Sequence, residues 1–281
     1  MIPSPFEYER ATSVANAIEL LSQGGEDSRL LAGGHSLLPL MRLRLARPSL
    51  LVDIGRIDDL RYITSEGDHV VVGAMTTHHE LADSRELGEA CPLLAATARQ
   101  IGDPQVRHRG TIGGSVAHAD PASDLPAALL ALDAEIVIEG ADGSRSVAAA
   151  DFFQGPFMSD LRDGELLSAI RVPVTRGGAS YLKFQRRAQD WAIVGVAAVV
   201  ESEGGAISRA AIGLTNMGGT PVRAGAVEEA LVGAGDETSI AGAAARVDEL
   251  DPPPGDDQAT PAFRSHLASV LIRRAVASAM A

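Results

Sequence analysis

The chain has 281 residues, of which 46% are hydrophobic and 22% charged, a composition typical of a globular protein large enough for two domains. Its formal net charge of −13, with no dense cluster of lysine or arginine, argues against nucleic acid as a partner. The single cysteine, Cys91, excludes an intrachain disulfide and cannot supply the thiolates of an ordinary iron–sulfur cluster.

The start of the chain lacks the basic and apolar regions of a secretory signal peptide. No apolar run approaches the ~20 residues that a helix needs to span a bilayer. We therefore expect no integral membrane segment and a cytoplasmic location.

The first part of the chain is predicted to mix helices with short strands. Apolar residues at helical spacing predict helices over residues 14–21, 81–100 and 124–132, the second of them broken at Cys91-Pro92. Short apolar runs predict strands at residues 30–32, 50–54, 70–74, 135–138 and 165–172.

A glycine-rich turn, Arg176-Gly177-Gly178, separates this part from the rest, and we place a domain boundary there. Beyond it, strands are predicted near residues 180–184, 192–201 and 206–215. Helices are predicted around residues 224–232 and 263–279. This pattern indicates an antiparallel sheet backed by helices over residues 177–281.

Two glycine-rich segments are the most informative feature of the sequence. They are Ala32-Gly33-Gly34-His35-Ser36, which follows a predicted strand, and Thr111-Ile112-Gly113-Gly114-Ser115. Glycine pairs let the backbone approach a ligand closely, and adjacent hydroxyl groups can donate hydrogen bonds to phosphate oxygens. One such turn alone is more often only a turn, but the pair predicts a clamp that holds a diphosphate from both sides.

Neither segment fits the common nucleotide-binding motifs. No lysine follows the glycines as in a Walker loop, and the G-x-G-x-x-G spacing of a Rossmann turn is missing. Nucleotide kinases and Rossmann dehydrogenases are therefore disfavoured.

The longer segments AGGHSLLP at residues 32–39 and TIGGSVAHADPASDLP at residues 111–126 resemble the two FAD-diphosphate motifs of the medium subunit of aerobic carbon monoxide dehydrogenases. These subunits belong to the xanthine oxidase, or molybdenum hydroxylase, family. The likeness runs from Pro5-Phe6-Glu7-Tyr8 to the predicted helix at residues 263–274 and covers nearly the whole chain.

The resemblance implies an α+β fold of vanillyl-alcohol-oxidase (PCMH) type. An FAD-binding PCMH-type domain at residues 1–176 would consist of two α/β subdomains, at about residues 1–55 and 56–176. A C-terminal medium-subunit flavoprotein domain, an antiparallel sheet with helices, would follow at residues 177–281.

The resemblance also implies which residues hold noncovalently bound FAD. Backbone amides are expected to make most of the contacts with the diphosphate. Ser115 stands where several relatives have asparagine, so its side chain keeps a donor but has a shorter reach. The residues implied for the two motifs are Ala32, Gly33, Gly34, His35, Ser36, Leu37, Thr111, Gly113, Gly114 and Ser115.

Further cofactor contacts follow from the same resemblance. Asp120 and Asp124 are expected near the ribityl or ribose hydroxyls, although Asp124 would equally cap the helix that it begins. Lys183 is expected at the pyrimidine edge of the flavin, and otherwise reads as a solvated strand residue. Trp191 is expected to stack on the isoalloxazine, and otherwise reads as a core anchor.

Two weaker candidates lie on predicted strands or beside them. Leu167 is implied as an apolar flavin contact, which a buried strand explains equally well, and Thr76 as a neighbour of the cofactor. No catalytic residue and no metal ligand is expected on this chain. His78-His79 is interpreted as a surface pair, because no further ligand lies at a recognisable spacing.

The implied function is that of an FAD-binding medium subunit in a carbon monoxide dehydrogenase-like oxidoreductase complex. A small subunit with two [2Fe-2S] clusters would pass electrons through FAD to an external acceptor, and a large subunit would hold the molybdenum cofactor. The expected assembly is a dimer of heterotrimers, in the cytoplasm or at the inner face of the cytoplasmic membrane. The substrate of the complex is not decided by this chain.

Two other functions stay open at this point. One is a stand-alone FAD-dependent reductase of the same fold, although no strong likeness to its substrate domain is present. The other is a flavin-less assembly protein, against which the intact glycine segments argue.

Overall fold

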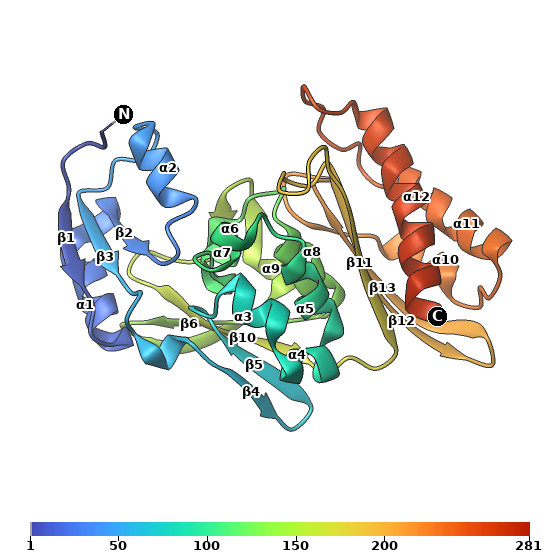
Figure 1. The fold of residues 1–281 in the computed structure, drawn as a ribbon, viewed down its shortest axis with the longest axis horizontal. Helices are drawn as coiled ribbons and strands as arrows, with labels where there is room; N and C mark the ends of the chain where they lie inside the picture. The colour runs from blue at the N-terminus through green and yellow to red at the C-terminus, as the bar shows by residue number, and fades with distance from the viewer. Residues whose placement is uncertain (1) are drawn as a thin grey trace.

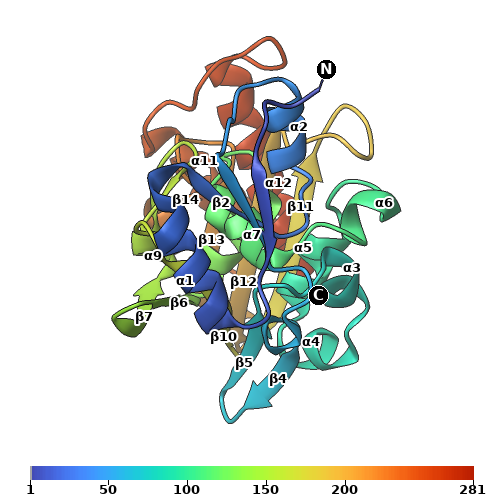
Figure 2. The same cartoon turned by 90° about the vertical axis from the view of Figure 1, so that its left-hand side faces the viewer.

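The N-terminal part forms a small parallel sheet with helices on its flanks. The computed structural model describes residues 2–281. The sheet has the order β1-β3-β2, from β1 (Glu7–Arg10), β2 (Ser28–Leu31) and β3 (Leu50–Asp53). Figure 2 shows these strands with α1 (Val14–Gly24) toward the viewer and α2 (Leu37–Arg42) above. Ser13 caps α1 by accepting a hydrogen bond from the Asn16 N–H.

A five-stranded antiparallel sheet forms the middle of the molecule, in the order β4-β5-β10-β6-β7. Helices α3 to α8 gather on one side of it (Figure 1). The strands are β4 (Ile63–Glu66), β5 (His69–Gly73), β6 (Glu135–Gly140), β7 (Gly143–Ala148) and β10 (Leu166–Pro173). The helices are α3 (His78–Asp83), α4 (Arg85–Ala90), α5 (Pro92–Arg99), α6 (Pro104–Arg107), α7 (Ile112–His118) and α8 (Asp124–Ala131). The short α9 (Ala149–Phe152), β8 (Phe153–Gly155) and β9 (Met158–Ser159) follow β7.

The C-terminal part is an antiparallel sheet in the order β11-β12-β13-β14, covered on one face by helices (Figure 1). Its strands are β11 (Gly178–Phe184), β12 (Val194–Glu203), β13 (Ala206–Thr215) and β14 (Val222–Arg223). Its helices are α10 (Gly225–Leu231), α11 (Glu237–Ala245) and α12 (Pro261–Met280). This arrangement confirms the predicted α+β fold. Within the described residues, no helix combines the length and apolarity needed to cross a membrane.

Helix α8 joins the middle and C-terminal layers. All of its residues are buried, and it lies against α5 and α7 on one side and β12 and β13 on the other. A Cβ atom at Gly213 of β13 would lie 2.9 Å from the carbonyl carbon of Ala127, so the strand and the helix touch through their backbones. A glycine is therefore required where α8 crosses the sheet.

Most predicted elements are confirmed, and the break at Cys91-Pro92 is real. Pro92 is the first residue of α5, where its missing N–H costs nothing. The main difference concerns the second glycine segment, which was expected to be a loop but forms the first turn of α7. The helices and strands that lie outside the predicted ranges are mostly short. They are β1, α2, β4, α6, β7, α9, β8, β9, β14 and α11, of which α11 begins with a capping box at Asp236.

Candidate cofactor-binding site

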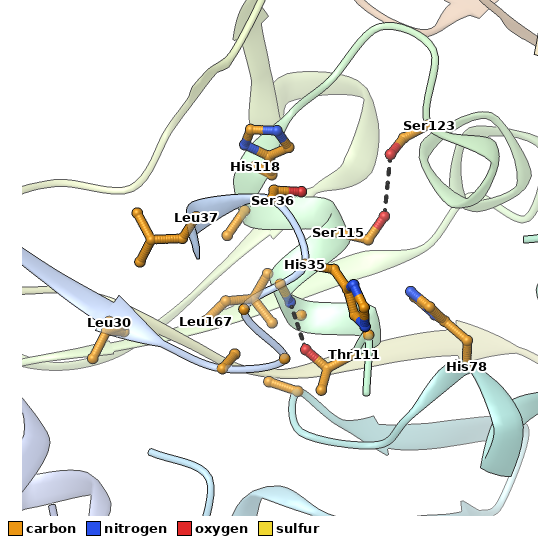
Figure 3. A pocket seen from close by; sticks show the side chains of 18 of the residues that line it. Leu30, His35, Ser36, Leu37, His78, Thr111, Ser115, His118, Ser123 and Leu167 are labelled. Carbon is orange, nitrogen blue, oxygen red and sulfur yellow. Dashed lines mark hydrogen bonds between the residues drawn. The ribbon is translucent and has the colours of Figure 1, made fainter. Parts of the chain in front are cut away.

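A cavity of about 440 Å³ lies where the N-terminal layer meets the middle of the molecule. Its size falls within the range of about 300–1,000 Å³ that is usual for ligand sites. Both glycine segments line it, and Figure 3 shows their side chains around one opening. Of the residues expected to contact a cofactor, those that line it are Ala32, Gly33, Gly34, His35, Ser36, Leu37, Thr111, Gly113, Gly114, Ser115, Asp124, Leu167 and Trp191.

The first glycine segment leaves its backbone amides free for a ligand. Within residues 2–281, the N–H groups from Gly33 to Leu37 have no hydrogen-bond partner, and the Ser36 hydroxyl does not cap α2. Gly34 has φ +78°, a conformation that favours glycine. A run of free N–H donors on a cavity wall fits an anion such as a diphosphate.

The second glycine segment differs, because the structure uses the amides of residues 112–115 internally. The Thr111 hydroxyl caps α7 by accepting from the Gly114 N–H at 3.1 Å. The other pairs are Ile112 N–H to the Thr76 carbonyl, Gly113 N–H to the Ala74 carbonyl and Ser115 N–H to the Thr111 carbonyl. These four amides are therefore already paired within the protein, whereas the Thr111 N–H has no hydrogen-bond partner within residues 2–281. Hydroxyl groups remain, and that of Ser115 lies 3.2 Å from that of Ser123.

The two segments lie directly against each other. A Cβ atom at Gly33 would lie 2.9 Å from both the Arg109 carbonyl carbon and the Gly110 Cα, and closer still to the Arg109 oxygen. A Cβ atom at Gly114 would point toward Ala32, 3.7 Å from its Cβ. Gly33 thus allows the backbones of the two segments to touch.

Thr76 supports the site without lining the cavity. Its side chain is buried and donates a hydrogen bond to the Tyr62 carbonyl at 2.9 Å. Its own carbonyl accepts from Ile112, and an isolated bridge joins the next residue, Thr77, to Thr111. Thr76 therefore fixes the position of the second glycine segment.

Asp124 and Lys183, expected as separate cofactor contacts, form a buried ion pair. Their side chains are 4% and 1% exposed, and Nζ lies 2.8 Å from Oδ2. The Tyr181 hydroxyl donates to Oδ1 at 2.6 Å, and Nζ also bonds the Gln100 carbonyl at 3.2 Å. Burial raises the pKa of Asp124, and Lys183 and Tyr181 oppose that rise. Asp124 reaches the cavity, whereas Lys183 lies behind it.

The positions of Lys183, Trp191 and Asp124 decide the alternative interpretations of these three residues. Lys183 is not a solvated strand residue, because its side chain is buried. Trp191 is not a core anchor, because it is 56% exposed at the cavity. Asp124 does not cap α8, because the N-cap residue is Ser123. Its carboxylate oxygens instead accept hydrogen bonds from Tyr181 and Lys183.

Asp120 lies apart from the cavity lining. Its Oδ1 accepts a hydrogen bond from the Ala122 N–H at 2.9 Å, and its carbonyl accepts from the Ser123 N–H. The carboxylate therefore orders the turn that carries Ser123 toward Ser115.

The interpretation of His78 as a surface residue is wrong. His78 is 5% exposed and lines the cavity, whereas its neighbour His79 faces outward and pairs with Asp83. The sequence held a signal for this, because Thr77-x-x-Glu80 is a capping box, and the structure shows both of its hydrogen bonds. Two adjacent residues at a helix start point in different directions, so only one of them is buried.

Sequence reasoning also missed His118 and Phe157 on the cavity wall. Their ring centroids lie 5.2 Å apart, and burial lowers the pKa of His118. Phe157 is exposed and has φ +58°, which is uncommon for an aromatic residue. No sequence pattern brings these two residues together, because a loop outside the motifs supplies Phe157.

Comparison with known proteins decides the family. Residues 4–175 match the family model described as FAD binding domain in molybdopterin dehydrogenase, and residues 179–279 match the CO dehydrogenase flavoprotein C-terminal domain. The chain belongs to this flavoprotein family. It is an FAD-binding medium subunit of the carbon monoxide dehydrogenase and molybdenum hydroxylase type, an oxidoreductase component of multi-subunit complexes.

Individual relatives match over their whole length. The carbon monoxide dehydrogenase medium chain of Afipia carboxidovorans is 43% identical, with 100% of this chain and 99% of the relative covered. The glyceraldehyde dehydrogenase medium chain of Sulfolobus acidocaldarius is 38% identical, with 98% of each covered. The reconstituted CO dehydrogenase from Oligotropha carboxidovorans has a TM-score of 0.97 at 43% identity, with 100% and 99% covered. These comparisons give no support to a stand-alone reductase or a flavin-less assembly protein.

Proposed function

We propose that this chain carries electrons from the [2Fe-2S] clusters of a small partner subunit, through FAD, to an external acceptor. A large partner subunit holds the molybdenum cofactor, and the complex is a dimer of heterotrimers most like aerobic carbon monoxide dehydrogenase. The observation that carries this proposal is the full-length match to a carbon monoxide dehydrogenase medium chain. Cytoplasmic location, with the complex able to lie at the inner face of the cytoplasmic membrane, is part of the same proposal.

The residues of the cavity divide the binding work between them. Bound FAD supplies the redox centre, and the protein supplies its position and its electrostatic environment. The free amides from Gly33 to Leu37 hold the diphosphate, and the hydroxyls of Thr111 and Ser115 assist from α7. A Cβ atom at Gly113 would lie 2.8 Å from the Ala74 carbonyl oxygen, so a glycine there lets α7 pack close to the site.

The remaining residues of this set would contact the flavin half of the cofactor. Asp124 accepts hydrogen bonds from cofactor hydroxyls, in an orientation that Lys183 and Tyr181 fix. The Lys183 charge lies behind that wall and favours negative charge on the reduced ring. Trp191 and Leu167 provide apolar contact with the ring.

We further propose the division into an FAD-binding domain at residues 1–176, with subdomains at about 1–55 and 56–176, and a C-terminal domain at residues 177–281. In support, the middle sheet ends at Pro173 with β10, and the next sheet begins at Gly178 with β11.

Copurification of the native complex tests the proposed function. We expect this chain to elute with a small and a large partner, with FAD, iron and molybdenum present together. Subunit identification by mass spectrometry and metal and flavin analysis are the measurements. Copper in the same fractions supports carbon monoxide as the substrate. A chain that elutes alone with FAD and turns over a substrate by itself contradicts the proposal.

Trp191 offers a direct test of cofactor position, because it is the only tryptophan of the chain. We expect FAD to quench most of the tryptophan emission of the flavin-free protein, since the indole lies at the cavity where aromatic stacking is possible. A fluorescence titration measures this. ADP, which lacks the isoalloxazine, is the control and leaves the emission nearly unchanged. Unchanged emission in protein saturated with FAD contradicts the placement of Trp191.

A further inference from the structure

His78 is a buried histidine whose hydrogen bonding is incomplete. It is the first residue of α3, it lines the cavity, and its side chain is 5% exposed. Within residues 2–281, its Nδ1 atom is shielded from solvent and has no hydrogen-bond partner. Buried polar atoms are nearly always paired in folded proteins, and leaving one unpaired is costly. Because the residue also lines the cavity, a ligand there can contact the ring of this incompletely bonded imidazole.

The position of the ring places it beside the anion-binding segment. The backbone N–H of His78 donates to the Gly110 carbonyl at 2.9 Å. A Cβ atom at Gly110 would lie 2.7 Å from the Cδ2 atom of the His78 ring. Gly110 thus leaves room for the imidazole. Figure 3 shows the His78 side chain extending toward the ring of His35, on the segment that carries the free amides.

The titratable groups that face His78 are basic or already paired. His35 approaches from the first glycine segment and Arg107 from α6. On its own helix, the Glu80 carboxylate is held by Arg61 at 2.8 Å and by the capping box. Burial, followed by His35 and Arg107, lowers the pKa of His78 to about 4. The imidazole is therefore neutral near pH 7 in the cofactor-free protein, within an electropositive setting.

We propose that the His78 imidazole binds an anionic oxygen of the dinucleotide and takes up a proton from solvent as it does so. The inference rests on the proposed assignment of this cavity to FAD. A diphosphate brings the negative charge that this setting lacks, so it offsets the positive charge of Arg107 and raises the pKa of His78. Above about pH 4 and up to the raised pKa, binding consumes a proton. FAD affinity then rises as the pH falls, by up to about tenfold per pH unit for this one group.

The test compares three full-length proteins: the unmodified chain, His78→Gln and His79→Gln. His79 is the matched control, because it is the adjacent histidine but faces outward and pairs with Asp83 at 3.3 Å. The dissociation constant of FAD is measured on flavin-free protein from about pH 5 to about pH 8. Calorimetry in buffers of different ionisation enthalpy counts the protons taken up. Because His35 can also respond to FAD, the difference between variants isolates His78.

We expect the unmodified chain and His79→Gln to share one pH profile and one proton count. His78→Gln should show a flatter profile, fewer protons taken up and about tenfold weaker binding near pH 6. Equal profiles and equal proton counts in His78→Gln and the unmodified chain overturn the proposal for His78 alone. Failure of the unmodified chain to bind FAD at any pH overturns the assignment of the cavity, and this proposal with it. His78→Asn replaces His78→Gln if circular dichroism shows that the latter is unfolded.

Discussion

The Gly33→Ala protein is expected to purify almost free of flavin. The added Cβ atom would lie 2.9 Å from the Arg109 carbonyl carbon and from the Gly110 Cα, both of which are backbone atoms that no rotamer change can move. The two glycine segments would have to separate, which displaces the run of free amides. We expect FAD affinity to fall by about 100-fold, or about 2.8 kcal/mol at about 1.4 kcal/mol per tenfold change.

The flavin-to-protein absorbance ratio and a titration of flavin-free protein with FAD measure this loss. Gly88→Ala is the matched control, because Gly88 lies in α4 and a Cβ atom there meets nothing within 4 Å. That variant should keep all of its flavin and gain slight stability, since alanine is the better helix former. Wild-type flavin content in Gly33→Ala would show that the diphosphate does not depend on this segment.

Loss of either partner in the buried ion pair should strongly destabilise the protein. Asp124→Asn leaves the Lys183 ammonium, 1% exposed, without a counter-charge, and Lys183→Met does the same to the Asp124 carboxylate. Breaking such a pair costs about 3–5 kcal/mol of unfolding free energy, because the remaining charge stays out of water. Urea denaturation followed by circular dichroism measures the change.

The double variant Asp124→Asn/Lys183→Met completes a thermodynamic cycle. It should be more stable than the sum of the two single changes predicts, because neither charge is then left alone. Glu89→Gln serves as the exposed control, since Arg85 and Glu89 are 91% and 68% exposed, and it should cost under about 1 kcal/mol. If Asp124→Asn and Lys183→Met each lose as little unfolding free energy as Glu89→Gln, the Asp124–Lys183 pair is hydrated in solution.

Elements marked by a clear apolar run could be read from the sequence. The strand predicted at residues 206–215 is β13 at the same residues, because a mainly apolar run bounded by turn residues is typical of a buried strand. Strand β1 could not be found in this way, since it is exposed throughout and is defined by parallel pairing with β3, about 40 residues away. Helix α11 has a weak apolar pattern and is built largely of alanine, but its capping box was a usable signal.

The candidate site, too, could be predicted from the sequence only in part. Local motifs located the residues of the first glycine segment on the cavity. Two adjacent glycines disfavour a helix, so the start of α7 could not be predicted from propensity. Its helix forms because Ala74 and Thr76, distant in sequence, accept its first amides. The pairing of Asp124 with Lys183 likewise depends on the packing of α8 against the C-terminal sheet, which no local pattern contains.

The burial of α8 on all sides limits how this chain can be divided in the laboratory. A fragment that stops at residue 176 would retain α8 but lose β12 and β13, and a helix with no polar face would meet water. The same cut would remove Lys183 from the Asp124 carboxylate. Expression of the two sequence domains as separate pieces is therefore a poor route to a flavin-binding module, and useful truncations are confined to the chain ends.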